Sequence, residues 1–201
     1  MRDLHDGLGG QLVSIVALSE RGEEAGSIGD AARAALKDLR LVIDSMDDIG
    51  GDLMLALGSW RDRVAAQLRP HGIALNWQIT PPGLPVHPEL RPGHVIQIVR
   101  LLDEAVTNTV KHARAQSITV SIATLNDASG PYGCISVADD GKGFAATPDG
   151  GSTRTAGRGL RNMQSRAARC GAKCDVVTGE SGTQVRLTLP HRFPEGDAGN
   201  N

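Results

Sequence analysis

Apolar residues recur at spacings of three and four in two stretches near the start of the chain, as in helices with one apolar face. The first stretch covers residues 3–20, with apolar positions at Leu4, Leu8, Leu12, Ile15, Val16 and Leu18. The second runs from Asp30, which can cap a helix, to the helix-ending pair Gly50-Gly51. We therefore predict a helical hairpin. Because its two apolar stripes need a partner, we expect a second copy to complete a dimeric four-helix bundle.

After the glycine pair, helical and strand-like patterns alternate. The predicted elements are, in order, a helix over 53–68, a strand over 73–79, a helix over 95–113, strands around 118–122 and 135–137, a helix over 160–170, and strands over 174–177 and 185–189. Neighbouring strands mostly join without a crossover helix. This order favours an α+β fold, in which a mixed or antiparallel sheet carries its helices on one face.

Composition changes divide the chain into three predicted parts. A helical hairpin domain occupies residues 1–50, an α/β sandwich domain residues 51–193, and a polar, disordered tail residues 194–201. Within the sandwich, a proline-rich connector runs over 81–92. Residues 145–156 are rich in Gly, Ser, Thr and Pro, so we expect a mobile loop there.

Composition and charge exclude several classes of function. A net charge of -2 and an aromatic content of 2% argue against nucleic-acid binding. No apolar run approaches the ~18–20 residues of a membrane span. Cys134, Cys170 and Cys174 lack zinc-site spacing and are expected to be reduced thiols in a cytoplasmic chain. Met1 stands only four residues before His5, which already lies inside the first predicted helix. We therefore expect this chain to be the C-terminal portion of a longer protein, with any membrane attachment in missing upstream segments.

Glu104 and Asn108 are four residues apart in a predicted helix, so their side chains share one face. A carboxylate and an amide oxygen stacked in this way suit Mg²⁺, which would itself bridge phosphate groups. Lys111, about one turn further on, could meet a phosphate as a point charge. Taken alone, the same three residues also describe the solvated face of a surface helix.

The segment Asp139–Phe144 follows a predicted strand and contains two glycines, Gly141 and Gly143. Glycines allow the backbone to approach a ligand closely. The Asp139 carboxylate can accept a hydrogen bond from an exocyclic amine, such as that of adenine. The alternative for this segment alone is an ordinary Asp-Gly turn of a β-hairpin.

Two further glycine-containing segments precede regular elements. The residues Gly157, Gly159 and Leu160 open a predicted helix, whose free amides and dipole form an anion site. The loop before them could close over phosphates. Gly182-Thr183 places a hydroxyl group at the start of the last strand, although alone it would be read as a turn.

Together and in this order, the four segments resemble the Bergerat-type ATP-binding fold. Glu104–Asn108 resembles its N box, Asp139–Phe144 its G1 box, Gly157–Leu160 its G2 box and Gly182-Thr183 its last conserved turn. That fold serves sensor histidine kinases, gyrase- and Hsp90-like ATPases and anti-sigma serine kinases. The resemblance implies that these segments bind ATP and Mg²⁺.

The residues around His5 favour the histidine kinases within this group. The segment Arg2–Leu12 is similar to the phosphoacceptor helix of the subfamily that includes the nitrate/nitrite and membrane-fluidity sensors. The resemblance implies that His5 takes the γ-phosphoryl group of ATP and that Asp6 orients its ring and accepts its proton. It also implies a homodimer and transfer of the phosphoryl group to an aspartate on the receiver domain of a response regulator.

The sequence departs from this subfamily at one position and leaves two alternatives open. The subfamily commonly has Gln five residues after the histidine, where this chain has Gly10, followed by Gln11. One residue turns a helical side chain by about 100°, so the resemblance does not extend to phosphatase activity. The alternatives are an ATPase in which Glu104 activates water, and a non-catalytic dimeric scaffold that binds nucleotide or a regulator.

Overall fold

The computed structural model describes residues 52–143 and 156–194, with no side-chain description for 156–158. The predicted hairpin over 1–50, including His5 and Asp6, lies outside the described residues. Most of the predicted loop over 145–156 and of the predicted tail over 194–201 lies outside them as well.

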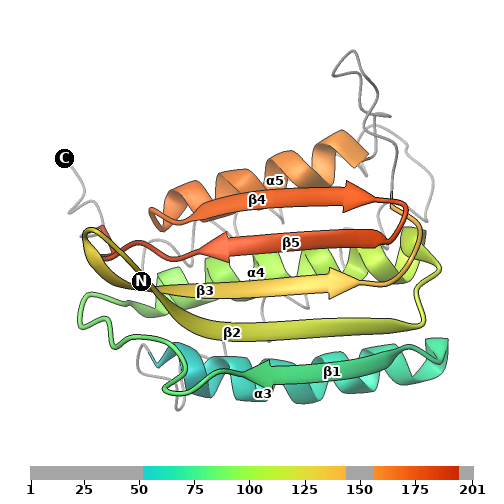
Figure 1. Cartoon of the computed structure of the whole chain (residues 1–201), viewed down its shortest axis with the longest axis horizontal. Helices are drawn as coiled ribbons and strands as arrows, with labels where there is room; N and C mark the ends of the chain where they lie inside the picture. Colours follow the sequence, from blue (N-terminus) through green and yellow to red (C-terminus); the bar gives the residue numbers. More distant parts are fainter. Residues whose placement is uncertain (1–51, 144–155, 195–201) are drawn as a thin grey trace, which may run out of the picture.

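Five strands form one mixed sheet in the order β1-β2-β3-β5-β4 (Figure 1). The strands are β1 (Ala74–Ile79), β2 (Ser117–Asp127), β3 (Gly130–Asp139), β4 (Lys173–Gly179) and β5 (Gly182–Thr188). Among the described strands, only the β1–β2 pair is parallel, and the long connection between these two strands contains a helix, as parallel neighbours require. All other pairs are antiparallel, which confirms the predicted mixed sheet.

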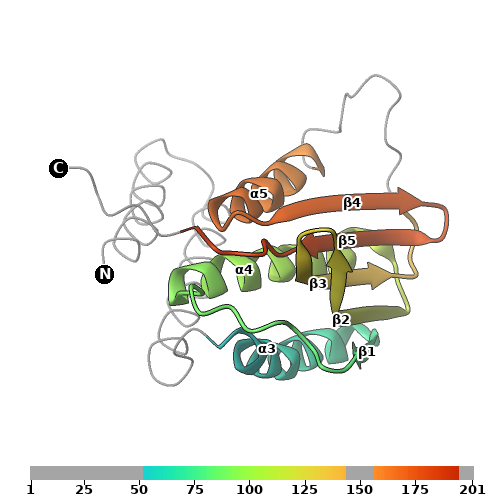
Figure 2. The ribbon, with the colours of Figure 1, turned by 60° about the vertical axis from the view of Figure 1, so that its left-hand side comes forward.

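In the described part of the chain, the long helices lie on the same face of the sheet, as Figures 1 and 2 show. They are α3 (Leu53–Leu68), α4 (Pro92–Asn108) and α5 (Ala156–Arg169). Two short helical turns follow directly on α3 and α4, namely η1 (Arg69–His71) and η2 (Thr109–Ala113). The predicted α+β class, with helices on one face, is therefore confirmed. Within the described ranges, no helix combines the length and apolarity needed to span a membrane.

Local sequence signals explain where the first two helices begin. Asp52 caps α3, because its Oδ1 accepts a hydrogen bond of 3.1 Å from the amide of Leu55. Pro92 occupies the first position of α4, where its missing amide hydrogen leaves no bond unmade. The amide of Arg91, just before α4, donates to Nδ1 of His94 at 3.2 Å. Both helices therefore begin where side chains or proline replace missing backbone bonds.

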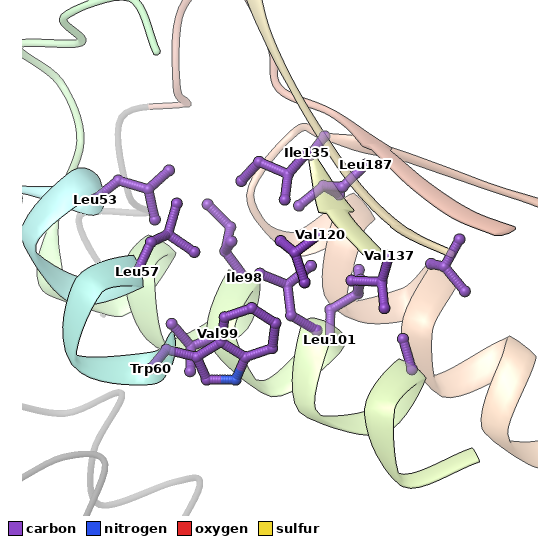
Figure 3. Packing of buried hydrophobic residues seen from close by; sticks show 14 of the residues in the cluster. Leu53, Leu57, Trp60, Ile98, Val99, Leu101, Val120, Ile135, Val137 and Leu187 are labelled. Atoms are coloured by element: carbon purple, nitrogen blue, oxygen red, sulfur yellow. The ribbon is translucent and has the colours of Figure 1, made fainter. Parts of the chain in front are cut away.

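The core lies between the helices and the sheet (Figure 3). Leu57 and Trp60 of α3 point toward Ile98 and Leu101 of α4, and side chains of the central strands meet them from the sheet. The labelled strand residues are Val120, Ile135, Val137 and Leu187. Each fully buried aliphatic or aromatic side chain contributes about 1.5–3 kcal/mol relative to an exposed one. Helix α4 holds the middle position and is therefore fixed from two sides.

The long helix predicted over residues 95–113 is divided in the structure. It is α-helical to Asn108 and continues as the wider π-helical turn η2. The carbonyl oxygen of Ala113, at the end of η2, accepts a hydrogen bond of 2.8 Å from the amide of Lys142. Arg114 then takes a left-handed conformation with φ 53°. The last turn thus bonds to Lys142, a residue far along the chain. The periodicity of apolar residues cannot predict such a contact.

The three cysteines carry free thiols, as the sequence predicted. Burial raises the pKa of Cys170 and of Cys174 to about 11. Both thiols therefore stay protonated at neutral pH, which keeps them unreactive.

A buried polar contact joins α3 to α4 and gives the first prediction. The indole Nε1 of Trp60 donates a hydrogen bond of 2.9 Å to Oδ1 of the buried Asp103. We expect Trp60→Phe to lower the free energy of unfolding by about 1–3 kcal/mol through this bond alone, because the buried carboxylate loses a donor. The measurement is urea unfolding followed by circular dichroism.

The matched control is Trp77→Phe, since Trp77 is half-buried and its ring lies 5.9 Å from that of Trp60. This substitution should lower the free energy of unfolding by less than Trp60→Phe does, because it removes aromatic contact area without taking a donor from Asp103. Equal losses in the two variants would contradict the importance of the Trp60–Asp103 bond.

Candidate functional site

A cavity of about 400 Å³ lies among α4, η2, α5 and the ends of β3, β4 and β5. Its apolar wall consists of Ala105, Ala113, Val137, Leu160, Met163, Val176 and Val185. Its polar wall consists of Asn108, Thr109, His112, Asp139, Lys142 and Thr183. Apolar walls with a few convergent polar groups are typical of small-molecule sites, and the volume is in the usual range.

Asp139 is the most heavily bonded side chain of this wall. Its Oδ1 accepts from the amides of Gly141 and Thr183 at 3.0 and 3.2 Å. Its Oδ2 accepts from the hydroxyl group of Thr109 at 3.0 Å. These donors come from the loop after β3, the start of β5 and the start of η2. The carboxylate is therefore held in one orientation at the cavity wall.

The two glycines of the Asp139 loop allow close contacts with the protein itself. A methyl group at Gly141 would overlap the carbonyl oxygen of Ala113, and one at Gly143 would overlap that of Gly179. The amide of Gly143 also donates to the Gly179 carbonyl at 3.1 Å. From the sequence, both glycines are expected to let a ligand approach the backbone. In the structure Gly143 does line the cavity, whereas Gly141 is buried against η2.

Gly182 occupies a position that only glycine fits. Its φ of 116° lies in a region that other residues rarely adopt. A methyl group there would also overlap the carbonyl oxygen of Asp139. The backbone of β5 can therefore start beside Asp139, which places Thr183 in the wall. The hydroxyl oxygen of Thr183 lies 3.3 Å from that of Thr178.

Asp140, next in the chain, fastens the site to the sheet. Its Oδ1 accepts from the amides of Gln116 and Ser117 at 2.8 and 2.9 Å, and its Oδ2 from the Ser117 hydroxyl at 2.8 Å. The hydrogen bonds from Ser117, the backbone one foremost, lower the pKa of Asp140 below its ordinary value of 3.8. Asp140 thus holds the start of β2 beside the end of β3.

Glu104 and Asn108 share one face of α4, as their spacing predicts, and α5 rests against them. A methyl group at Gly159 would lie 2.8 Å from Glu104 Oε1 and 3.4 Å from Asn108 Nδ2. Asn108 lines the cavity, whereas Glu104 is half-buried beside α5 and outside the described wall. The absence of a side chain at Gly159 therefore lets the two helices approach at this point.

The other predicted residues are divided between the wall and its surroundings. Leu160 and Thr183 line the cavity. Gly157 lies in the first turn of α5. Lys111 is exposed on η2 and is not part of the described wall. The structure thus brings Asn108, Asp139, Gly143, Leu160 and Thr183 to one cavity, one or more from each of the four segments.

Sequence reasoning missed several residues of the wall. Thr109 lies inside the helix predicted over residues 95–113, where its hydroxyl group is the only feature of the sequence that could mark it. Lys142 lies within the Asp139–Phe144 segment and His112 directly follows Lys111, but neither pattern indicates a role for these two side chains. Met163 and Val176 carry only an apolar signal, which does not separate a cavity wall from a core.

The contact of Gly182 with Asp139 gives a prediction about stability. We expect Gly182→Ala to lower the free energy of unfolding by more than about 2 kcal/mol, because it adds a clash to an unfavourable φ. Gly58→Ala is the matched control, since Gly58 lies in α3 with open space at its Cβ position. That change should instead stabilise the protein by about 0.5–1 kcal/mol. Thermal or urea unfolding of both variants measures these changes in stability. A Gly182→Ala protein as stable as the wild type would contradict the conclusion that only glycine fits at this position.

The hydrogen bonds of Asp140 give a prediction about pH. Because the pKa of Asp140 is lower in the folded protein than in the unfolded chain, its ionised form stabilises the fold. This contribution is present above the ordinary pKa of 3.8 and is lost as pH falls through the lower, folded value. We therefore expect Asp140→Asn to be less stable than the wild type at pH 7, by an amount that shrinks below about pH 4.

The measurement is urea unfolding across this pH range, with Asp62→Asn on the exposed face of α3 as the control. A stability difference between Asp140→Asn and wild type that stays constant with pH would contradict this role of Asp140.

The part of the chain that contains the site matches a known protein family. Residues 93–192 match the family described as histidine kinase-, DNA gyrase B-, and HSP90-like ATPase. The sensor histidine kinase LiaS of Bacillus subtilis is 26% identical over 209 residues, an alignment that covers 96% of this chain and 53% of LiaS. The sensor protein VraS of Staphylococcus epidermidis is 28% identical over 113 residues, covering 56% of this chain and 30% of VraS. The chain thus spans about half or less of the length of these relatives.

Among solved structures, a similar fold occurs in the histidine kinase domain of the blue-light activated histidine kinase from Erythrobacter litoralis EL346. The TM-score is 0.61 at 22% identity, with 94% of this chain and 91% of that domain covered. This likeness supports the fold, and the predicted Bergerat-type α/β sandwich is confirmed for the described residues. The comparisons thus support the resemblance to two-component sensor histidine kinases, and residues 93–192 match the ATPase family that these kinases share with DNA gyrase B and HSP90.

Proposed function

We propose that this chain is an ATP-dependent kinase that phosphorylates its own His5 and passes the phosphoryl group to an aspartate on the receiver domain of a response regulator. The main support for the proposal is the set of residues that line the cavity described above. Asn108, Asp139, Leu160 and Thr183 come from four separate segments and line the same space. The similarity of the chain to the sensor histidine kinases LiaS and VraS supports the same activity.

The base of ATP would bind at Asp139 against the apolar wall. The carboxylate would accept a hydrogen bond from the exocyclic amine of adenine. Leu160, Met163 and Val185 line the cavity and would make apolar contact with a purine ring. Gly141, Gly143 and Gly182 would act indirectly, because their close backbone contacts hold Asp139 and Thr183 in place.

The phosphates would bind toward the start of α5. The helix there begins in the segment that holds Gly157 and Gly159, and its free amides and dipole favour an anion. Lys142 and His112 line the cavity, and the ammonium group of Lys142 would add positive charge. Lys111 would have to reach the phosphates from the exposed side of η2.

Two oxygen-bearing side chains suit a magnesium ion. Asn108 faces the cavity, and Glu104 lies one helical turn away on the same face. An amide oxygen and a carboxylate fit Mg²⁺, which takes its remaining ligands from phosphates and water. When bound, the ion would neutralise developing negative charge during phosphoryl transfer.

The chemical step would join His5 to the γ-phosphorus of ATP. A ring nitrogen of His5 forms the new N–P bond as the bond to the ADP oxygen breaks, and Asp6 accepts the imidazole proton. The dimer, formed through the hairpin over residues 1–50, would bring this histidine to an ATP site. An aspartate of the receiver domain would then take the phosphoryl group from His5.

Incubation of the full chain with Mg²⁺ and ATP labelled in the γ-phosphate tests this proposal. We expect the label on the protein to be acid-labile and alkali-stable, as a phosphohistidine is. The label should be absent from His5→Gln, which lacks the nucleophile. His71→Gln is the matched control, because His71 is an exposed histidine of η1 and should leave labelling unchanged.

The two alternatives give different results in the same assay. Release of phosphate without labelled protein would indicate an ATPase in which Glu104 activates water. Binding of ATP, seen as a thermal shift, without label or release would indicate a non-catalytic scaffold. Persistence of the label in His5→Gln would show that the phosphoacceptor is another residue.

A further inference from the structure

Thr109 brings a buried hydroxyl group to the carboxylate of Asp139. The residue is 5% exposed and begins the π-helical turn η2. Its Oγ1 lies 3.0 Å from Asp139 Oδ2 and 3.3 Å from the carbonyl oxygen of Ala105. The hydroxyl group has one hydrogen to donate. The shorter distance and the charged acceptor favour donation to Asp139, because bonds to ionised oxygens are stronger than bonds to carbonyls.

The hydrogen bonds of Asp139 leave little acceptor capacity unused. An ionised carboxylate offers about four lone-pair positions. Two amides occupy both positions on Oδ1, and Thr109 occupies one on Oδ2. Within the described part of the chain, these three donors leave one acceptor position on Oδ2 for a ligand in the cavity. A carboxylate filled in this way presents a single acceptor in a fixed direction.

Both partners of this bond are held by the same piece of structure. Thr109 lies at the start of η2, and the Ala113 carbonyl at its end accepts from the amide of Lys142. Gly141, between Asp139 and Lys142, is packed against that same carbonyl group. The hydroxyl group and the carboxylate therefore keep their separation. The hydrogen bond between them therefore joins two segments, η2 and the loop after Asp139, that are also connected through their backbones.

We propose that Thr109 is a positioning residue that selects the base of the nucleotide. By filling one acceptor site of Oδ2, it aims the remaining site at the exocyclic amine of a 6-aminopurine. This inference rests on the proposed ATP site and goes beyond it, because it assigns selectivity to a residue that need not touch the ligand. Without the hydroxyl group, only the two amides on Oδ1 restrain the carboxylate about χ2, a torsion with a broad energy profile, so the direction of Oδ2 is less closely defined.

Two nucleotides that differ only in the amine provide the test. ATP carries the exocyclic amine, and purine riboside triphosphate has hydrogen in its place. We expect the wild-type chain to bind ATP more tightly than the analogue. In Thr109→Val, which keeps the shape but lacks the hydroxyl, this preference should fall about fivefold to tenfold, as expected for a weakened hydrogen bond to a charged group. Affinity for the analogue should change by less than about twofold.

Thr109→Ser retains the hydroxyl group and should restore the preference for ATP. Should Thr109→Val fail to fold, Thr109→Ala makes the same test, with urea unfolding used to verify each variant. Equally weaker binding of both nucleotides would overturn the inference, because it would indicate that Thr109 has a role in packing only. An unchanged preference in Thr109→Val would overturn it as well. If the wild type binds neither nucleotide, the ATP site itself is wrong, which is a distinct result.

Discussion

The carboxylate of Asp139 is the point at which three separate parts of the chain meet. It takes hydrogen bonds from the loop after β3, from the start of β5 and from the first residue of η2. Each bond to an ionised oxygen is stronger than one between neutral groups. The wall of the cavity depends on this junction, because Thr109, Asp139 and Thr183 all line it. The polar end of the site is thus ordered before any ligand enters.

Glycine makes that junction possible at close range. Gly141, Gly143 and Gly182 each lie where a side chain would overlap a backbone carbonyl oxygen of another segment. In each case the partner belongs to the site or to a turn beside it. Glycines that were expected to let a ligand approach the backbone therefore also serve to pack backbone against backbone. These two uses of glycine share a cause, which is that only a residue without Cβ permits such an approach.

The layered fold fixes the remaining side of the site. Helix α4 lies between α3 and α5 and packs its apolar face on the sheet, as Figures 2 and 3 show. Its last turn then presents Asn108 to the cavity, while the first turn of α5 rests beside Glu104 at Gly159. The burial that stabilises the domain thus also sets the distance between the two helices at the proposed phosphate end. Stability and ligand geometry depend on the same packing.

The sequence by itself determined the elements and the segments that build the site. The spacing of apolar residues predicted the helices and strands from Leu53 to Leu189, since this periodicity follows directly from helix and strand geometry. The motifs likewise named Asn108, Asp139 and Thr183, because their chemistry and order are local properties. Tertiary structure alone decided the π-helical turn, the burial of Gly141 and the bond from Thr109 to Asp139. Each of these depends on a partner about 30 residues away, and such a contact leaves no periodic signal in the chain.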